Sequence, residues 1–250
     1  MSAFPCVSRT RGPLCLLLIL IWAVLSGGTA MGQPAAQGPT LRPDTMQARV
    51  AACTACHGAQ GKAGTDGYYP RLAGKPRDYL YHQLLNFRDG LRQYRPMTHL
   101  LTGLPDDYLL EIATYFADQH VPYPPASRPA VSASTLEHGR VLATRGDTAR
   151  GIPACVACHG TSFSGLAPAI PGLLGLPRDY IGSQIGGWKN GLRRAAEPDC
   201  MADIVQKLTP EDIGALSAWL SSRTIVEPYV PDPAGSTTLP AECGSQAQQR

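Results

Sequence analysis

Two short cysteine motifs constrain the fold of this chain more than any other feature of its sequence. Residues 53–58 read CTACHG, and residues 155–160 read CVACHG. The segments that follow each motif also match: PRLAGKPRDY at 70–79 with PGLLGLPRDY at 171–180, and RDGLR at 88–92 with KNGLR at 189–193. Self-similarity at one spacing indicates an internal repeat. The chain is therefore predicted to contain two copies of one unit.

The motif C-x-x-C-H is typical of covalent haem attachment. Its two thiols add across the two vinyl groups of a haem, and the adjoining histidine is placed to ligate the iron. The pattern predicts two covalently bound haem c groups, held by Cys53, Cys56, Cys155 and Cys158, with proximal ligands His57 and His159. The alternatives are a redox dithiol, which needs no following histidine, and a zinc site built from paired C-x-x-C motifs. The sequence shows no alternation of strand and helix such as accompanies a redox dithiol, and the repeat of the complete motif favours covalent haem.

The second axial ligand of each iron is predicted by elimination. Haem iron of this kind takes its distal ligand from Met or His. Beyond the second motif the chain has no histidine, and its only methionine is Met201; Met97 occupies nearly the same place after the first motif. A lone Met is more often a gap filler in a core, but one per repeat at a matching distance favours ligation. His82 and His99 stay open as alternatives for the first iron.

The first thirty residues have the pattern of a secretory signal. Arg9 and Arg11 precede an apolar run at 14–25, and small residues lead to a cleavage site after Ala30. The run is shorter than the roughly twenty residues that cross a bilayer, so export is predicted, with a retained N-terminal anchor as the alternative. The rest of the chain carries 20 Lys and Arg against 19 Asp and Glu. That balance argues against nucleic-acid binding, which needs a concentrated basic face.

The repeat also predicts the domain organisation. We expect a signal peptide at 1–30, a first domain at 31–119, a Pro-rich linker at 120–133, a second domain at 134–226 and a Pro-rich tail at 227–250. Apolar residues at helical spacing predict helices over 106–119 and 210–222. Further helices are expected from Asp44 into the first motif and over 135–145, the latter opened by a capping box of Ser134 and Glu137. Thr209 is the expected cap of the last helix, and Gly139 is expected to let Trp219 pack closely.

These residues resemble the class I cytochromes c, and their tandem arrangement resembles the dihaem cytochrome c4 family. The resemblance covers nearly all of residues 44–222. It rests on the two C-x-x-C-H motifs, on Met97 and Met201, on the LAGxPxDY-like segments, and on the runs Q-x-x-x-(F/W)-(R/K)-x-G-x-R that begin at Gln83 and Gln184. It implies an all-α pair of haem domains that pass electrons in the periplasm. By analogy with that family, the residues expected near the haem propionates are Arg77, Tyr79, Arg178 and Tyr180.

Two cysteines remain once the signal and the haem motifs are set aside, Cys200 and Cys243. In an oxidising compartment an even remainder usually pairs. A disulfide would pin the tail across the second domain, and a loop of that size is worth about 4 kcal/mol in the entropy model. The alternative is suggested by the dihaem thiosulfate dehydrogenases, which resemble this fold but use a cysteine thiolate as iron ligand. In that case Cys200 would compete with Met201.

The predicted function is single-electron transfer by a periplasmic dihaem cytochrome, as a free carrier or as the cytochrome subunit of a dehydrogenase or respiratory chain. Iron that is ligated on both sides has no vacant position for a substrate, so an enzyme is not expected. The expected partners are redox proteins: a dehydrogenase as donor, and an oxidase or another cytochrome as acceptor. A subunit or an anchored form would associate peripherally with the membrane. The alternatives from another class are a thiosulfate dehydrogenase and a dihaem peroxidase.

Overall fold

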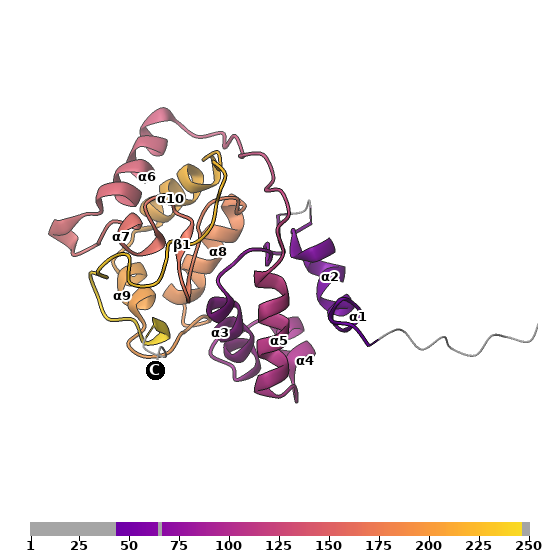
Figure 1. The fold of residues 1–250 in the computed structure, drawn as a ribbon. Coiled ribbons are helices and arrows are strands. Elements are labelled where there is room, and N and C mark those ends of the chain that lie inside the picture. Colours follow the sequence, from indigo (N-terminus) through magenta and orange to yellow (C-terminus); the bar gives the residue numbers. More distant parts are fainter. Residues whose placement is uncertain (1–43, 65–66, 247–250) are drawn as a thin grey trace, which may run out of the picture. The chain divides into compact units, whose positions relative to one another are not determined.

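Helices are the main secondary structure in the computed structural model, which describes residues 44–64 and 67–246 (Figure 1). The first half contains α1 (Met46–Arg49), α2 (Ala51–His57), the 3₁₀ turn η1 (Ala59–Gly61), α3 (Arg77–Arg88), α4 (Arg95–Leu101) and α5 (Asp106–Ala117). The second half contains α6 (Ala133–Arg145), η2 (Thr148–Arg150), α7 (Val156–His159), β1 (Gly165–Leu166), β2 (Ile170–Pro171), α8 (Arg178–Lys189), α9 (Cys200–Gln206), α10 (Pro210–Ser221) and η3 (Gly244–Gln246). The predicted all-α class is confirmed.

The proposed signal peptide at 1–30 lies outside the described residues. Within the described ranges, none of the helices is long and apolar enough to span a membrane. The described residues all lie in one compact unit. The division into two haem domains at 120–133 therefore stays a prediction that rests on the repeat.

Each half has its own hydrophobic core. In the first half, α3 packs on α5, and the fully buried side chains are Val50, Leu109 and Phe116. In the second half, α10 packs on both α6 and α8 around Leu142, Val205 and Trp219. The long helix that follows each cysteine motif thus packs on the last helix of its own half, α3 on α5 and α8 on α10, and each half has a separate apolar cluster. The extensive α6–α10 contact belongs to the second half.

The crossing of α6 and α10 depends on Gly139. A Cβ at this position would lie 2.2 Å from the carbonyl oxygen of Ala215 and 2.8 Å from the Cβ of Trp219. Any side chain here would push the two helices apart, because neither the backbone nor a Cβ atom can move out of the way. The expected close packing of Gly139 and Trp219 is confirmed.

Three expected helix boundaries differ from the structure. The first helix is broken at Val50, and its cap is Thr45, because Asp44 is instead paired with Arg49. Helix α6 begins earlier than expected: the Ser132 hydroxyl accepts a hydrogen bond from the Thr135 N–H. Ser134 is therefore not the cap, and the Glu137 carboxylate pairs with Arg140. In contrast, Thr209 caps α10 as expected, in a capping box with Asp212.

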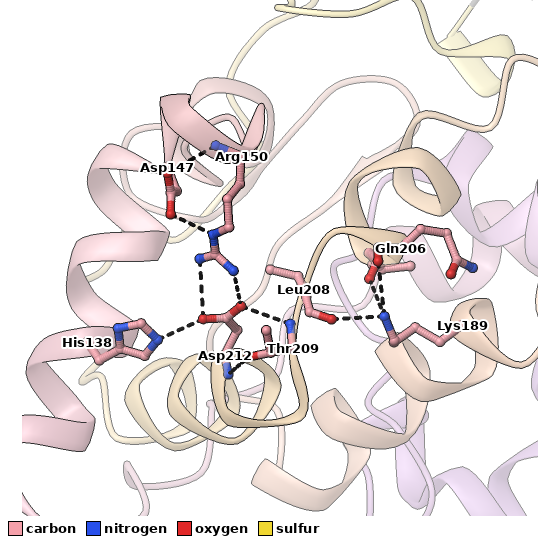
Figure 2. Close-up of polar contacts among 9 residues, drawn as sticks. His138, Asp147, Arg150, Lys189, Gln206, Leu208, Thr209 and Asp212 are labelled. Atoms are coloured by element: carbon pink, nitrogen blue, oxygen red, sulfur yellow. Dashed lines mark hydrogen bonds and ion pairs between the residues drawn. The ribbon is translucent and has the colours of Figure 1, made fainter.

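Asp212 also joins three segments of the second half (Figure 2). Its side chain is 3% exposed and accepts from His138 on α6 at 2.7 Å and from Arg150 in η2 at 2.6 Å. The N–H of Thr209 donates to the same carboxylate at 2.8 Å. Arg150 is held in turn by Asp147 at 2.6 Å. The turn η2, which precedes the second motif, is thereby fixed to the start of α10.

We expect Gly139→Ala to lower the free energy of unfolding by about 1–3 kcal/mol, because the new methyl group overpacks the α6–α10 crossing. Denaturant unfolding of the haem-loaded protein measures the change. Gly214→Ala on α10 is the matched control, since a Cβ there meets nothing within 4 Å. That control should leave stability unchanged or raise it by up to about 1 kcal/mol through helix propensity. Equal effects at the two glycines would contradict the close crossing.

The stability of the protein should fall in acid partly through Asp212. Burial raises the pKa of this carboxyl, but the hydrogen bonds from Arg150, Thr209 and His138 outweigh it and hold the pKa well below its usual range. A depressed folded-state pKa gives stability that is present above the unfolded value of about 4 and is lost as pH falls below it. Asp212→Asn should therefore lose less stability than the wild type between about pH 5 and pH 3. Glu211→Gln, on the exposed side of the same helix, should behave like the wild type.

Candidate functional site

A buried histidine ends the short helix that carries each cysteine motif. His57 closes α2 and is 6% exposed, and His159 closes α7 and is 8% exposed. The Nδ1 atom of His57 lies 2.8 Å from the carbonyl oxygen of Pro70, and Nδ1 of His159 lies 2.8 Å from that of Pro171. A carbonyl only accepts, so Nδ1 must carry the proton. The lone pair of each ring is then on Nε2, the form in which histidine ligates iron.

The electrostatics of both rings agree with this form. Burial lowers the pKa of His57, and it lowers the pKa of His159 to about 4. Both imidazoles are therefore neutral near pH 7. A neutral, oriented imidazole is what a metal or haem iron requires on its proximal side.

A glycine directly after each histidine lets the chain turn back beneath the ring. Gly58 and Gly160 have φ values of +74° and +82°. A Cβ on Gly58 would lie 2.5 Å from the Ala63 carbonyl oxygen, and one on Gly160 would lie 2.7 Å from that of Gly165. Only glycine satisfies both the positive φ and the close approach. The two motifs are therefore better described as C-x-x-C-H-G.

The thiols of the motifs do not have the environment of a redox dithiol. Cys53, Cys56, Cys155 and Cys158 are all unbridged. Burial raises the pKa of Cys155 to about 11 and also raises the pKa values of Cys53 and Cys158. A reactive dithiol needs the opposite shift. Within the described residues, no group of three or more His, Cys, Asp or Glu is placed to hold a metal ion.

The candidate methionines lie on matching helices. Met97 is on α4 and packs against the hydrophobic cluster that also contacts Cys53. Met201 is on α9 and packs against the cluster that also contacts Cys155. Each methionine therefore shares an apolar cluster with the first cysteine of its own motif.

The two rival histidines differ in their surroundings. His99 lies on α4 but is exposed to solvent. His82 is half-buried on α3, next to Tyr81. Of the two candidate ligands on α4, Met97 is therefore the one whose side chain packs against the core, as a buried iron ligand would.

A hydrogen-bonded network joins equivalent residues of the two repeats. Arg92 donates to Gln83 at 2.9 Å, to Tyr180 at 3.3 Å and to Gln184. Arg193 makes the reciprocal set, to Gln184 at 2.9 Å, to Tyr79 at 3.4 Å and to Gln83 at 3.2 Å. The backbones of 91–94 and 192–194 also pair, with Gln93 N–H donating to the Leu192 carbonyl at 2.7 Å. Each arginine thus bridges the glutamines of both halves.

Among the residues that the structure describes, no acidic side chain forms an ion pair with either of these two buried arginines. Arg92 is 8% exposed, Arg193 is 7% and the nearby interface residue Lys75 is 5%. Of the ion pairs in the described ranges, none includes any of the three. Burial lowers the pKa of Lys75 to about 7, and its Nζ donates to the Gly172 carbonyl at 2.7 Å. Buried charges are normally paired, so the site fits anionic groups such as haem propionates.

The four residues expected near propionates divide into two kinds. Tyr79 and Tyr180 lie in the buried network, beside Arg193 and Arg92. Arg77 is exposed and paired with its neighbour Asp78 at 2.6 Å, and Arg178 is also exposed.

Arg92 and Arg193, which contact these tyrosines, are not among the residues predicted from the sequence. A signal was present, because Arg92 and Arg193 close the same Q-x-x-x-(F/W)-(R/K)-x-G-x-R run in both repeats.

Cys200 and Cys243 form a disulfide, with Cα atoms 5.1 Å apart. Cys200 is the first residue of α9, directly before Met201. Its sulfur is bonded to the tail, so it is not a free thiolate. The chemistry of a cysteine-ligated iron is accordingly not supported at this position.

A C-x-x-C-H motif that occurs twice, each time with a buried and neutral histidine, in a helical fold, is characteristic of c-type cytochromes. Comparison with known proteins identifies the kind. The chain is 36% identical over 176 residues to the Thiosulfate dehydrogenase electron acceptor of Thiomonas intermedia, covering 70% of this chain and 80% of that protein. It is 37% identical to Cytochrome c4 of Pseudomonas aeruginosa, covering 70% and 85%.

The structural comparison agrees. The crystal structure of reduced recombinant cytochrome c4 from Pseudomonas stutzeri matches with a TM-score of 0.62 and 30% identity, covering 71% of this chain and 96% of that one. No family profile matches the chain. The chain belongs to the cytochrome c4 family, and it is an electron-transfer protein that uses haem c.

Proposed function

We propose that the chain binds two haem c groups and carries electrons one at a time between redox proteins of the periplasm. The observation that carries this proposal is the duplication of a complete donor set. Each half has a free thiol pair, a buried histidine whose Nδ1 is fixed by a proline carbonyl, and a methionine on the same apolar cluster. A single haem would leave one of these sets without a purpose.

Each set has residues for every contact that a haem c requires. Cys53 and Cys56 would hold the first haem by thioether bonds, with His57 and Met97 as axial ligands. Cys155 and Cys158 would hold the second, with His159 and Met201. A haem bound in this way supplies an iron that takes up and releases one electron.

The polar contacts of the haems would come from the network between the halves. Arg92, Arg193 and Lys75 provide positive charge, and Tyr79 and Tyr180 provide hydroxyl groups, for the propionates. Arg77 and Arg178 remain a weaker proposal, since both are exposed to solvent. Because the same side chains also bridge the halves, they would hold the two haem sites in a fixed arrangement.

The protein would tune the carrier in three ways. The proline carbonyls orient the imidazoles, and the apolar clusters exclude water from the sites. A methionine thioether favours a higher potential than a histidine or thiolate would. With both axial positions filled, each site is suited to electron transfer without binding a substrate.

The electron donor is proposed to be a dehydrogenase. One relative carries the name Thiosulfate dehydrogenase electron acceptor, so a thiosulfate dehydrogenase is the first donor to test. An oxidase or another cytochrome would be the acceptor. The signal-like residues 1–30 support export, and a retained anchor would place the carrier at the membrane surface.

The enzymatic alternatives are less well supported. A thiosulfate dehydrogenase built on this chain would need Cys200 as a free thiolate, whereas that sulfur is bonded to Cys243. A peroxidase would need an iron without its methionine in the resting protein, whereas both methionines pack against the apolar cluster that contacts their own cysteine motif. The carrier function requires no rearrangement of either site.

Absorbance of the oxidised protein tests the axial ligands. The weak red band of methionine-to-ferric-iron ligation should be present at an intensity that corresponds to two haems, and intact-mass measurement should show two covalent haems. Met97→Ala and Met201→Ala should each remove about half of the band, because each deletes one thioether ligand. Met46→Ala, on α1, is the matched control and should retain the full band. A full band in either ligand variant would refute that assignment.

Reduction potentials test the propionate contacts. Removing a buried positive charge near an iron disfavours the added electron, so Arg92→Gln should lower a potential by roughly 40–90 mV, or about 1–2 kcal/mol at an effective dielectric constant of about 20. Arg92→Lys keeps the charge and should retain most of the potential. Arg77→Gln, at an exposed and paired arginine, is expected to leave it unchanged. A larger shift for Arg77→Gln than for Arg92→Gln would reverse the assignment.

A further inference from the structure

We propose that the helix of Met201 is held so firmly by its surroundings that the second iron keeps its methionine, while the first iron exchanges Met97 for small external ligands such as imidazole. This inference rests on the proposed ligand set and adds a difference between two sites whose donor atoms are the same. The difference lies in what holds α4 and α9.

The N-terminal end of α9 is fixed by a buried carboxylate. Asp199 is 6% exposed, and one of its oxygens caps the helix by accepting from the Ala202 N–H at 3.1 Å. Its other oxygen accepts from the Ala195 N–H at 2.7 Å and from the Trp188 indole N–H at 3.2 Å. Asp199 thus ties the residue before Cys200 both to the preceding loop and to α8.

The C-terminal end of α9 is fixed by a lysine (Figure 2). The Lys189 ammonium group donates to the carbonyl oxygens of Val205 at 3.1 Å, Gln206 at 3.2 Å and Leu208 at 2.8 Å. Val205 and Gln206 lie in the last turn of α9, where carbonyl oxygens lack intrahelical N–H partners, and Leu208 follows the helix. A cation there also interacts favourably with the helix dipole.

The tail adds a third attachment, which is covalent. After α10 it passes β1 and then α9 (Figure 1). Near β1, the Asp232 N–H donates to the Gly165 carbonyl at 2.9 Å, and the Asp232 carbonyl accepts from the Ala167 N–H at 2.8 Å. The buried Tyr229 hydroxyl accepts a hydrogen bond from the Leu174 N–H at 3.0 Å. Near α9, Cys243 forms its disulfide with Cys200.

The tail therefore connects the two sides of the second haem site. Leu174 belongs to the loop whose Pro171 carbonyl orients His159, and Cys200 precedes Met201. Next to the disulfide, the Gly244 N–H donates to the Pro198 carbonyl at 2.9 Å. Movement of α9 away from the core would have to break or carry all of these contacts.

Helix α4 has fewer attachments. Its cap residue, Tyr94, makes no side-chain capping hydrogen bond. Thr98 donates to the Phe87 carbonyl at 2.9 Å, and Arg88 reaches the Leu104 carbonyl at 3.0 Å. The segment after α5 does hold the proximal loop of the first half, because Arg71 donates to the Pro122 carbonyl at 3.0 Å.

That segment does not reach α4, however. Among the described residues, no hydrogen bond, ion pair or disulfide joins 118–132 to the helix of Met97. In both halves, a following segment thus holds the loop that orients the proximal histidine. Among the described residues, such a segment is also bonded to the methionine helix in the second half alone, through the disulfide at Cys200.

Exchange of an axial methionine requires a local opening, in which the thioether leaves and another donor enters. The free energy of such an opening grows with the contacts that must be broken. A helix cap alone contributes about 1 kcal/mol, and a disulfide contributes more. The opening of α9 should therefore be rarer than that of α4, and external ligands should enter first at the iron of Met97.

Stopped-flow mixing of the oxidised, haem-loaded protein with imidazole tests this inference. Loss of the red band should occur in two phases of equal amplitude, with rates that differ by at least about tenfold, which equals about 1.4 kcal/mol of barrier. The double variant Cys200→Ser/Cys243→Ser should accelerate the slow phase only. Changing both cysteines leaves no thiol beside Met201 to compete for the iron.

Three further variants assign the phases. Lys189→Gln should also accelerate the slow phase, and it serves if the double variant does not fold. Thr98→Val should accelerate only the fast phase. Thr237→Ala, in the exposed part of the tail, should alter neither.

The possible failures are distinguishable. A missing red band before imidazole is added would refute the methionine ligands, and the inference with them. A full band that is lost at one rate, or a fast phase that responds to the cysteine variants, would overturn only the inference about α9.

Discussion

The hydrogen bond from each buried histidine Nδ1 to a proline carbonyl is the interaction on which the rest of this structure depends. It forces the segment after each motif to fold back under the imidazole, so that Pro70 and Pro171 reach His57 and His159. The reversal requires a glycine with positive φ directly after the histidine. It also places the start of the next long helix at Arg77 and Arg178, immediately after Pro76 and Pro177. One polar contact thereby positions the cysteine motif and helices α3 and α8.

The surface between the halves follows from the same duplication. Because Arg92 and Arg193 end equivalent runs, their backbones meet as an antiparallel pair and their side chains exchange glutamine partners. Two guanidinium groups close together in a buried place repel each other, and burial together with Arg92 lowers the pKa of Arg193. The amide and hydroxyl dipoles of the network offset part of this cost. The remaining positive charge makes the surface suited to anionic groups from both haem sites.

Much of this organisation could be predicted from the sequence, because the informative signals are local. The motifs identify the thiols and histidines, and apolar spacing predicts α5 and α10. The predicted cap of α6, Ser134, differs from the observed cap, Ser132. Both serines suit the role, and the residue at which the helix begins decides between them. Arg92 and Arg193 were missed for a different reason: their importance arises from a contact between residues about a hundred positions apart. The Cys200–Cys243 bond could be anticipated, since pairing of leftover thiols follows from their number.

Two irons with the same donor atoms need not behave alike, and the second half shows how a protein can make them differ. None of the residues proposed as ligands departs from the repeat. The departures lie around the ligands. Asp199 caps α9 through its side chain, whereas Tyr94 at the start of α4 makes no such bond. Cys200 stands where the first half has Pro96, and it is bonded to a tail that the first half lacks. All three act on the helix that carries Met201. Additions of this kind change how readily a ligand leaves while keeping its chemistry, because they act on the free energy of opening and leave the iron–sulfur bond unaltered.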